Sequence, residues 1–134
     1  MGQFDLYMAP IDGDGTIGKA TNLGQKVNTE GQEMFPYISA DNILYFSSDG
    51  HLGLGGMDVF FAKLVDGKVG PVRNIGIPVN GNADDFAFSI NNATGEGFVS
   101  SNREGGAGSD DVYAVSYTHL RAHETEADLV CRLL

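Results

Sequence analysis

The sequence predicts an all-β protein that is built from repeats of about 53 residues, and three observations support this. A short phrase, in which glycine and aspartate are separated by two residues and followed by an apolar run, begins at Gly2, Gly55 and Gly108. The copies therefore lie 53 residues apart (55 − 2 and 108 − 55), and such a fixed period indicates a repeat architecture. Apolar residues also alternate with other residues in short runs, as in half-buried strands. The 19 glycines favour short strands joined by tight turns.

Composition and charge exclude several classes of function. The formal net charge is −10 and no basic cluster is present, which argues against binding to nucleic acid or to an anionic membrane surface. No run of 18 apolar residues is present, so we expect no membrane-spanning helix. The N-terminus lacks the basic and apolar stretches of a signal peptide. The repeat phrase begins directly after Met1, so we expect upstream sequence to be missing.

Residues 1–33 are predicted to form the end of a first repeat and a linker. Residues 6–9 are expected to form a short strand, and residues 19–24 the strand that returns beside it. Between them, residues 11–16 contain two Asp-Gly steps, which favour a hairpin turn because these residues tolerate positive φ.

Residues 34–80 are predicted to form one complete repeat. The expected strands are residues 35–39, 43–47, 58–64 and 72–75. Pro36 lacks an amide donor, so it belongs at a strand start or on a sheet edge. The run at 43–47 is continuously apolar, as in a strand that is buried on both faces. Four antiparallel strands in about 50 residues are what one blade of a β-propeller requires.

Residues 81–114 are predicted to form part of a third repeat. Phe86, Phe88 and Ile90 align with the strand at Phe35, and residues 97–101 align with residues 44–48. The third strand is expected to begin at Asp111 and to end at Ala114. A second pair of matches, residues 22–24 with 74–76 and residues 27–28 with 79–80, has an offset of 52 instead of 53.

Residues 115–134 break the pattern. They contain no glycine, the only cysteine (Cys131) and two of the three histidines, and we expect no fourth strand in them. The stretch resembles a translated sequencing adapter, so it is predicted to be non-native and is set aside from fold reasoning. The alternative is a native amphipathic C-terminal helix in which Leu129, Val130, Leu133 and Leu134 share an apolar face.

Three linked motifs carry a family resemblance. Residues 35–41 (FPYISAD), 44–50 (LYFSSDG) and 55–60 (GGMDVF) together resemble the WD40-like (PD40) β-propeller repeat, which is also found in TolB. Residues 74–80 (NIGIPVN) and 98–103 (FVSSNR) are similar to the propeller of OmpA-family envelope proteins of Gram-negative bacteria. The resemblance covers residues 2–114. It implies a fragment of a β-propeller with about two to two and a half four-stranded antiparallel blades.

The same resemblance implies a function. It implies a non-catalytic scaffold or protein-interaction segment of a peptidoglycan-associated protein in the periplasm or at the outer membrane. Other envelope proteins would be its partners, and peptidoglycan would be bound only through a domain of which nothing is visible in this chain. Two alternatives stay open, which are a propeller that binds Ca²⁺ or glycans and a propeller appended to an absent hydrolase domain. No cofactor is expected.

Several acidic groups invite a metal-binding hypothesis. Residues 12–15 (DGDG) look like the start of a calcium loop, but Leu23 stands at the twelfth position, where an EF-hand needs glutamate. A hairpin turn is therefore favoured. The pairs at 84–85 and 110–111 could each offer carboxylates to a metal, yet both precede a strand, which favours the capping of turns.

A hydrolase hypothesis arises from Ser47, Ser48, Asp49 and His51. Nucleophilic catalysis needs a base that is oriented by a third group, and often a strained turn of the type Gly-x-Ser-x-Gly. That turn is absent, and the matching residues 100–104 (SSNRE) contain no histidine, so we expect no enzyme activity. The cations Arg103 and Lys26 are interpreted as partners in surface salt bridges.

The repeated phrase itself is interpreted as a structural turn. Its residues are Gly2, Asp5, Gly55, Asp58, Gly108 and Asp111. The glycine is expected to supply a backbone conformation that other residues resist, and the aspartate to accept hydrogen bonds from backbone amides at the strand entrance. The alternative is that the aspartates face a ligand at the rim of the propeller. On its own, the chain is expected to expose apolar faces and to be loosely folded or prone to association.

Overall fold

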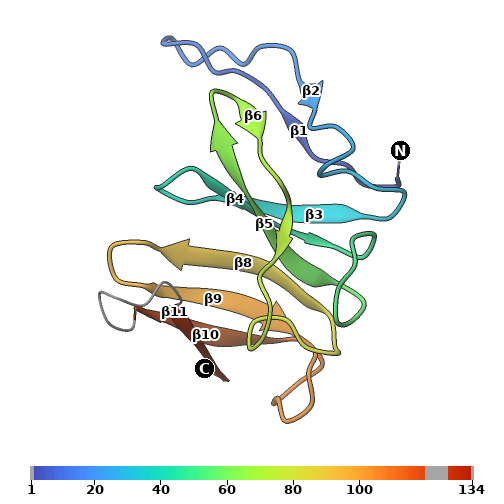
Figure 1. The fold of residues 1–134 in the computed structure, drawn as a ribbon, viewed down its shortest axis with the longest axis vertical. Helices are drawn as coiled ribbons and strands as arrows, with labels where there is room; N and C mark the ends of the chain where they lie inside the picture. Colours follow the sequence, from blue (N-terminus) through green and yellow to red (C-terminus); the bar gives the residue numbers. More distant parts are fainter. Residues whose placement is uncertain (1, 120–126, 134) are drawn as a thin grey trace.

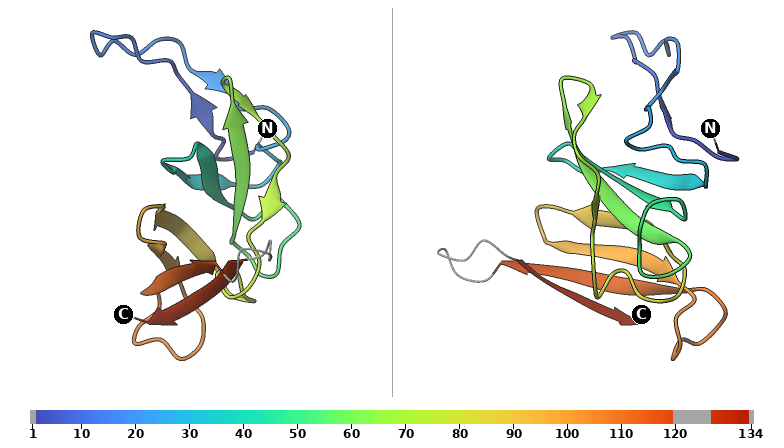
Figure 2. Two further views of the ribbon diagram at one scale, coloured as in Figure 1. Left: turned by 60° about the vertical axis from the view of Figure 1, so that its left-hand side comes forward. Right: turned by 45° about the vertical axis from the view of Figure 1, so that its right-hand side comes forward.

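The computed structural model describes residues 2–119 and 127–133. Within these residues the protein is all-β, as predicted, with eleven strands and no helix. The strands form three antiparallel sheets, which follow one another in chain order along the long axis of the molecule (Figures 1 and 2). No helix in the described part of the chain is long and apolar enough to cross a membrane.

The first sheet is a two-stranded ribbon. It pairs β1 (Tyr7–Met8) with β2 (Thr21–Asn22). The segment between them folds back at a hairpin turn, in which the Asp12 amide donates to the Thr16 carbonyl at 2.9 Å. Gly15 lies in the turn with a φ of 88°, a conformation that glycine adopts without steric cost.

The second sheet contains five strands. They are β3 (Glu33–Ile38), β4 (Ile43–Ser48), β5 (Asp58–Val65), β6 (Lys68–Val69) and β7 (Arg73–Asn74). The order is β3-β4-β5-β6, and β7 also pairs with β5, so two short strands stand where the sequence predicted one. Pro36 lies on the edge strand β3, as predicted from its missing donor.

The third sheet contains β8 (Asp85–Asn91), β9 (Glu96–Ser101), β10 (Asp111–His119) and β11 (Ala127–Leu133) in the order β11-β10-β9-β8. Two predictions are wrong here, because the third strand does not end at Ala114 and a fourth strand is present. The helical alternative is also wrong for β11. From residue 113 to residue 118, large side chains alternate with Ala, Ser and Thr, which continues the strand pattern of β10. β11 also supplies backbone partners to the second edge of β10. The adapter origin of residues 115–134 stays a prediction.

The first strands of the second and third sheets, β3 and β8, each contain a bulge. Glu33 pairs with Ser48 and Asp85 pairs with Ser101, so β3 and β8 correspond at an offset of 52 (85 − 33). Phe86 therefore corresponds to Met34, so the predicted alignment of Phe86, Phe88 and Ile90 with the strand at Phe35 is confirmed for the strands. Each strand has a bulge at the same place, where one residue adopts a left-handed conformation and shifts the alternation. These residues are Phe35 (φ 54°) and Ala87 (φ 56°).

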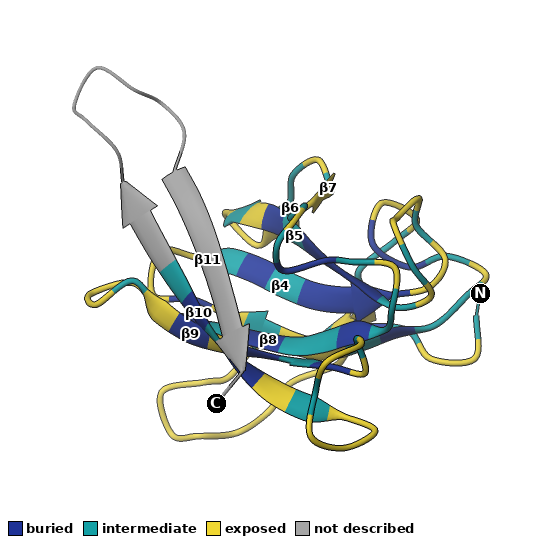
Figure 3. Ribbon diagram, turned by 90° about the horizontal axis from the view of Figure 1, so that it is seen from below, coloured by how far each residue is buried: buried dark blue, intermediate teal, exposed yellow. Residues whose placement is uncertain are grey.

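Two apolar clusters hold the sheets together. Between the first and second sheets, Leu6, Val27, Leu44, Phe46 and Phe60 form one cluster. Between the second and third, a larger cluster contains Val59, Val79, Phe88, Ile90, Val99, Tyr113 and Val115. β4 and β8 contact each other here, with Tyr45 of β4 packed against the cluster, and Figure 3 shows buried residues in both strands. Fully burying one such side chain contributes roughly 1.5–3 kcal/mol, so each sheet depends on its neighbour.

Two apolar side chains on the far face of the third sheet are partly exposed. Phe98 and Val112 keep 47% and 46% of their surface exposed. Val59, which corresponds to Val112 at the offset of 53, is fully buried against the third sheet. The exposed apolar face that the sequence predicted is present in the fold.

Candidate functional site at the sheet junctions

The repeated Gly-x-x-Asp phrase forms the same contact in all three copies. The glycine amide donates a hydrogen bond to the aspartate carboxylate three residues later. The pairs are Gly2–Asp5 (3.3 Å), Gly55–Asp58 (3.0 Å) and Gly108–Asp111 (3.0 Å). Asp58 is the buried copy, and its Oδ2 also accepts from the Leu54 amide at 2.7 Å. Its second oxygen, Oδ1, has no hydrogen-bond partner.

In two of the three copies, Gly2 and Gly55, the glycine of the phrase is needed for space. Neither Gly55 nor Gly108 has a left-handed φ, so the expected conformational role is wrong for these two residues. A Cβ atom on Gly55 would instead overlap the carbonyl oxygen of Ala83, on the segment that leads into β8. At Gly108 the nearest atom to such a Cβ lies 3.7 Å away. Of Gly55 and Gly108, only Gly55 lacks room for a Cβ atom, because the segment leading into the next sheet approaches it closely.

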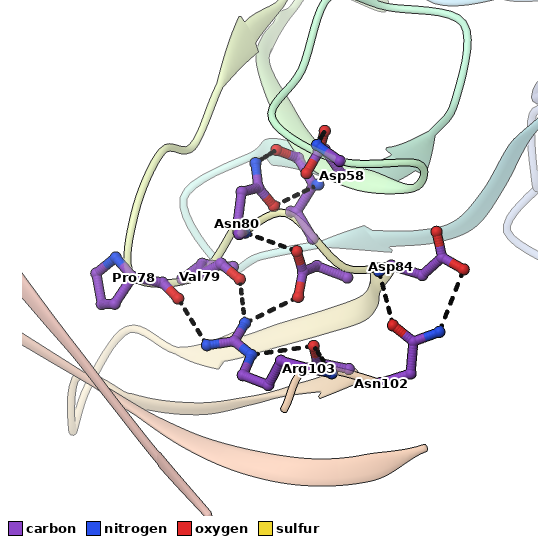
Figure 4. A network of polar contacts seen from close by, with 12 residues as sticks. Asp58, Pro78, Val79, Asn80, Asp84, Asn102 and Arg103 are labelled. Carbon is purple, nitrogen blue, oxygen red and sulfur yellow. Dashed lines mark hydrogen bonds and ion pairs between the residues drawn. The ribbon is translucent and has the colours of Figure 1, made fainter. Parts of the chain in front are cut away.

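A buried asparagine links β5 to the loop that follows its sheet. Asn80 Oδ1 accepts from the Val59 amide at 2.7 Å, and Nδ2 donates to the Val59 carbonyl at 2.8 Å and to Asn74 Oδ1 at 2.9 Å. Figure 4 shows Asn80 beside the Arg103 network. The side chain thus supplies a partner to the buried amide of Val59. It is also a second donor to the Val59 carbonyl, which accepts from the Ile75 amide at 3.2 Å as well.

The first sheet contains the same arrangement, in which an asparagine side chain binds the amide and the carbonyl of one residue. We call this arrangement the asparagine clamp. Asn28 Oδ1 accepts from the Leu6 amide at 2.7 Å, and Nδ2 donates to the Leu6 carbonyl and to Asn22 Oδ1, each at 2.9 Å. The 52-residue offset between residues 22–28 and 74–80 therefore has a physical basis. Sequence reasoning found the repetition but assigned no role to these asparagines.

An ion pair occupies the junction of the second and third sheets (Figure 4). The guanidinium of Arg103 lies 2.8 Å from Asp85 Oδ1, and Asp85 is fully buried whereas the arginine side chain is 22% exposed. The same guanidinium donates to the Pro78 carbonyl at 3.0 Å and to the Val79 carbonyl at 2.6 Å. It also lies 4.9 Å from the ring centre of Tyr113. Arg103 thus forms a salt bridge, as predicted, but with a buried carboxylate at a sheet junction instead of at the surface, while Lys26 is exposed.

A different set of side chains occupies the junction of the first and second sheets. The Glu33 carboxylate, which corresponds to Asp85, accepts from the Thr29 amide (2.9 Å), the Thr29 hydroxyl (2.6 Å) and the Ser48 hydroxyl (2.7 Å). His51 Nε2 lies 2.7 Å from the Val27 carbonyl oxygen, and its ring is 5.1 Å from that of Phe60. His51 therefore contacts the carbonyl that corresponds to the one bound by Arg103.

These contacts bear on the hydrolase hypothesis. The Ser48 hydroxyl donates to Glu33, and the His51 ring contacts a backbone carbonyl. Asp49 Oδ1 accepts from the Gln32 amide at 2.7 Å. The Ser47 hydroxyl accepts from the Ala87 amide at 3.3 Å, across the junction to the third sheet. Each of the four side chains is thus engaged with a backbone or carboxylate group, and the set is not arranged as nucleophile, base and orienting acid.

The acidic pairs fall in turns. Asp84 Oδ1 accepts from the Met57 amide at 2.9 Å, which ties the second sheet to the start of β8. Asp110 is exposed, next to the capped Asp111. Asp14 Oδ1 accepts from the Thr16 amide, and this bond lowers the pKa of Asp14 below its usual 3.8. In the described part of the chain, no three His, Cys, Asp or Glu side chains gather as metal ligands would.

One open cleft lies between the hairpin loops of the second and third sheets. It has a volume of about 360 Å³, and its lining includes Asp41, Tyr45, Asn92 and Thr94.

Comparisons of the chain with family models, with curated proteins and with solved structures found no match. The junctions therefore have to be interpreted from their own geometry, in which side chains fix backbone groups of adjacent sheets.

Proposed function

We propose that the chain is a segment of a β-propeller of the WD40-like repeat type that serves as a non-catalytic scaffold for protein interaction. One observation carries the proposal, which is that structure repeats at offsets of 52 and 53 residues: the second and third sheets have the same antiparallel strand order, and the first and second have the same asparagine clamp. Sheets that pack face to face in chain order are the unit of a propeller. Stability in such arrays comes largely from neighbouring repeats.

The non-catalytic part of the proposal rests on how the polar groups are used. Inside the junctions, the side chains of Arg103, Asn80 and Glu33 bind backbone groups and neighbouring side chains. A reactive group must instead reach a substrate in an open site. The polar groups at the junctions therefore support a structural role better than a chemical one.

The envelope assignment rests on the resemblance of residues 74–80 and 98–103 to OmpA-family propellers. We propose a location in the periplasm or at the outer membrane, with other envelope proteins as partners. Peptidoglycan binding would belong to a domain outside this chain. The structure adds that residues 74–80 include the asparagine clamp and that residues 98–103 end with Arg103.

The reading frame that flanks the source locus tests this proposal. We expect further copies of the Gly-x-x-Asp phrase at intervals of 52–53 residues, and a peptidoglycan-binding domain after the last copy. In place of residues 115–134, we expect a strand-turn-strand sequence that continues the third repeat. A flanking frame without further repeats would reject the propeller, and one that encodes a hydrolase domain would favour the appended-propeller alternative.

Calcium titration separates the scaffold from the Ca²⁺-binding alternative. Asp58 and Asp111 already accept hydrogen bonds from backbone amides, and Asp84 does so across a junction. We therefore expect the melting temperature of the chain to be the same in millimolar CaCl₂, in MgCl₂ and in EDTA. A rise that occurs in CaCl₂ alone would contradict the scaffold proposal, because a ligand that binds the folded state stabilises it.

A further inference from the structure

An apolar groove lies beside the first sheet, at its contact with the second. It has a volume of about 240 Å³ and is lined by side chains of β1, β3, β4 and β5, among them Leu6, Tyr7, Pro36, Ile38 and Leu64. Ile38 keeps 52% of its surface exposed. An exposed apolar surface of this kind marks a place where another structural element can dock.

The third sheet shows what covers the corresponding surface. Ile90 and Phe88 correspond to Ile38 and Pro36 at the offset of 52, yet they are only 6% and 3% exposed. They are covered by the second sheet, where the Tyr45 ring lies 4.8 Å from that of Phe88 and the Tyr37 hydroxyl donates to the Ile90 carbonyl at 2.8 Å. Tyr37 belongs to β3 and Tyr45 to β4, so the cover is a two-stranded hairpin.

The first sheet has no corresponding hairpin within the described residues. β5 pairs with β4 on one edge and with β6 and β7 on the other, whereas β1, which corresponds to β5, pairs only with β2. One edge of β1 is therefore open beside the groove. The open edge and the apolar groove together have the geometry that strand addition requires, with main-chain pairing for affinity and side-chain contacts for specificity.

We propose that this groove docks a β-hairpin with the side-chain pattern of residues 33–48. Its second strand would pair with the open edge of β1, and its two tyrosines would lie over Pro36 and Ile38. The inference rests on the repeat architecture of the proposed function, and it specifies the chemistry of the partner segment.

A second copy of the chain is a poorer occupant. In each copy β4 already pairs with β3 and with β5 along its length, so its hairpin would have to separate from its own sheet before it could dock. That separation would break backbone hydrogen bonds and expose the apolar cluster around Phe46 and Phe60. The occupant that the geometry favours is therefore a further hairpin of this type.

The test extends the full chain by one hairpin. Residues 33–54 are duplicated and joined directly to Gly2 in place of Met1, which keeps the native spacing because Gly55 and Gly2 hold equivalent positions. Hydrogen exchange of the Tyr7 and Met8 amides is then compared by NMR with that of the original chain. We expect exchange at β1 to slow by at least about tenfold, because the opening of a paired strand costs more free energy.

A matched control carries the same extension with Tyr37→Ser and Tyr45→Ser in the duplicated copy only. We expect exchange at β1 in this control to match that of the original chain. Unchanged exchange in the tyrosine-containing extension would overturn the proposal. A concentration-dependent dimer of the original chain in sedimentation, with protection of β1, would also overturn it in favour of a second copy. Either failure is distinct from failure of the propeller proposal, which the flanking sequence decides.

Discussion

The junctions on the two sides of the second sheet share one backbone arrangement and differ in their side chains. At the junction with the third sheet, buried Asp85 pairs with Arg103, which also binds two loop carbonyls. At the junction with the first sheet, Glu33 is satisfied by Thr29 and Ser48, and His51 contacts the loop carbonyl. The repeat therefore conserves the backbone groups that need partners, and different side chains can supply those partners.

The largest expected effect follows from Arg103→Met. This change would leave the Asp85 carboxylate buried without a cation and remove the donors to Pro78 and Val79. Breaking a buried pair by removing one partner costs about 3–5 kcal/mol, and the partial exposure of Arg103 places our expectation at about 3. Urea unfolding followed by circular dichroism measures it. The same change at exposed Arg73 is the control, and equal losses at both positions would contradict a special role for Arg103.

The next effect compares the two asparagine clamps. Asn80→Ala would leave the amide of Val59 buried without this partner and remove one of the two donors to its carbonyl, which we expect to cost about 1–3 kcal/mol of unfolding free energy. Asn28→Ala removes the corresponding bonds to Leu6, so a similar loss is expected. A loss at only one of the two positions would show that the clamps are not equivalent in energy.

A smaller difference in stability is expected between alanine substitutions at two copies of the glycine in the repeated phrase. Gly55→Ala would force a Cβ into the carbonyl oxygen of Ala83, and overpacking of this kind costs about 1–3 kcal/mol. Gly108→Ala meets nothing closer than 3.7 Å, so its melting temperature should stay close to that of the native chain. Equal destabilisation by the two changes would mean that the close approach at Gly55 does not limit packing.

Asp58→Ala tests the aspartate of the phrase. The change removes the acceptor for the Leu54 and Gly55 amides, and we expect a loss of about 1 kcal/mol or more in unfolding free energy. The buried Oδ1 of Asp58 lacks a partner, which limits the net gain from this carboxylate. Unchanged melting of the Asp58→Ala chain would show that the turn holds without the carboxylate.

The smallest effect concerns Asp14 in the hairpin turn. The hydrogen bond from the Thr16 amide lowers the pKa of Asp14 below 3.8 in the folded chain. A lowered folded-state pKa means that the contribution to stability is present above the unfolded-state pKa and is lost as the pH falls through the folded-state pKa. NMR titration should therefore place the pKa of Asp14 below 3.8, and a value at or above 3.8 would contradict the turn geometry.

The sequence predicted the strands better than it predicted the junctions. Strand alternation and Asp-Gly turns are local, so β1, β4, β5 and the hairpin at residues 11–16 could be located without a structure. Asp85 and Arg103 meet only because β8 pairs with β9, and no local pattern indicates which cation faces which carboxylate. The bulges were missed because their left-handed residues, Phe35 and Ala87, are not glycines. β11 was missed because its partner strand was expected to end at Ala114.

The bulges have a consequence for self-association. β3 and β8 are edge strands, and a regular edge offers a row of unpaired backbone groups on which another chain can stack as a sheet. In β3 the left-handed residue Phe35 is followed by Pro36, so the edge is both kinked and short of one donor. In β8 the kink lies at Ala87, and the second sheet binds two of its backbone groups, the Ala87 amide through Ser47 and the Ile90 carbonyl through Tyr37. The edge of β3 is therefore protected by its own proline, whereas the edge of β8 depends on its neighbouring sheet for protection against intermolecular β-structure.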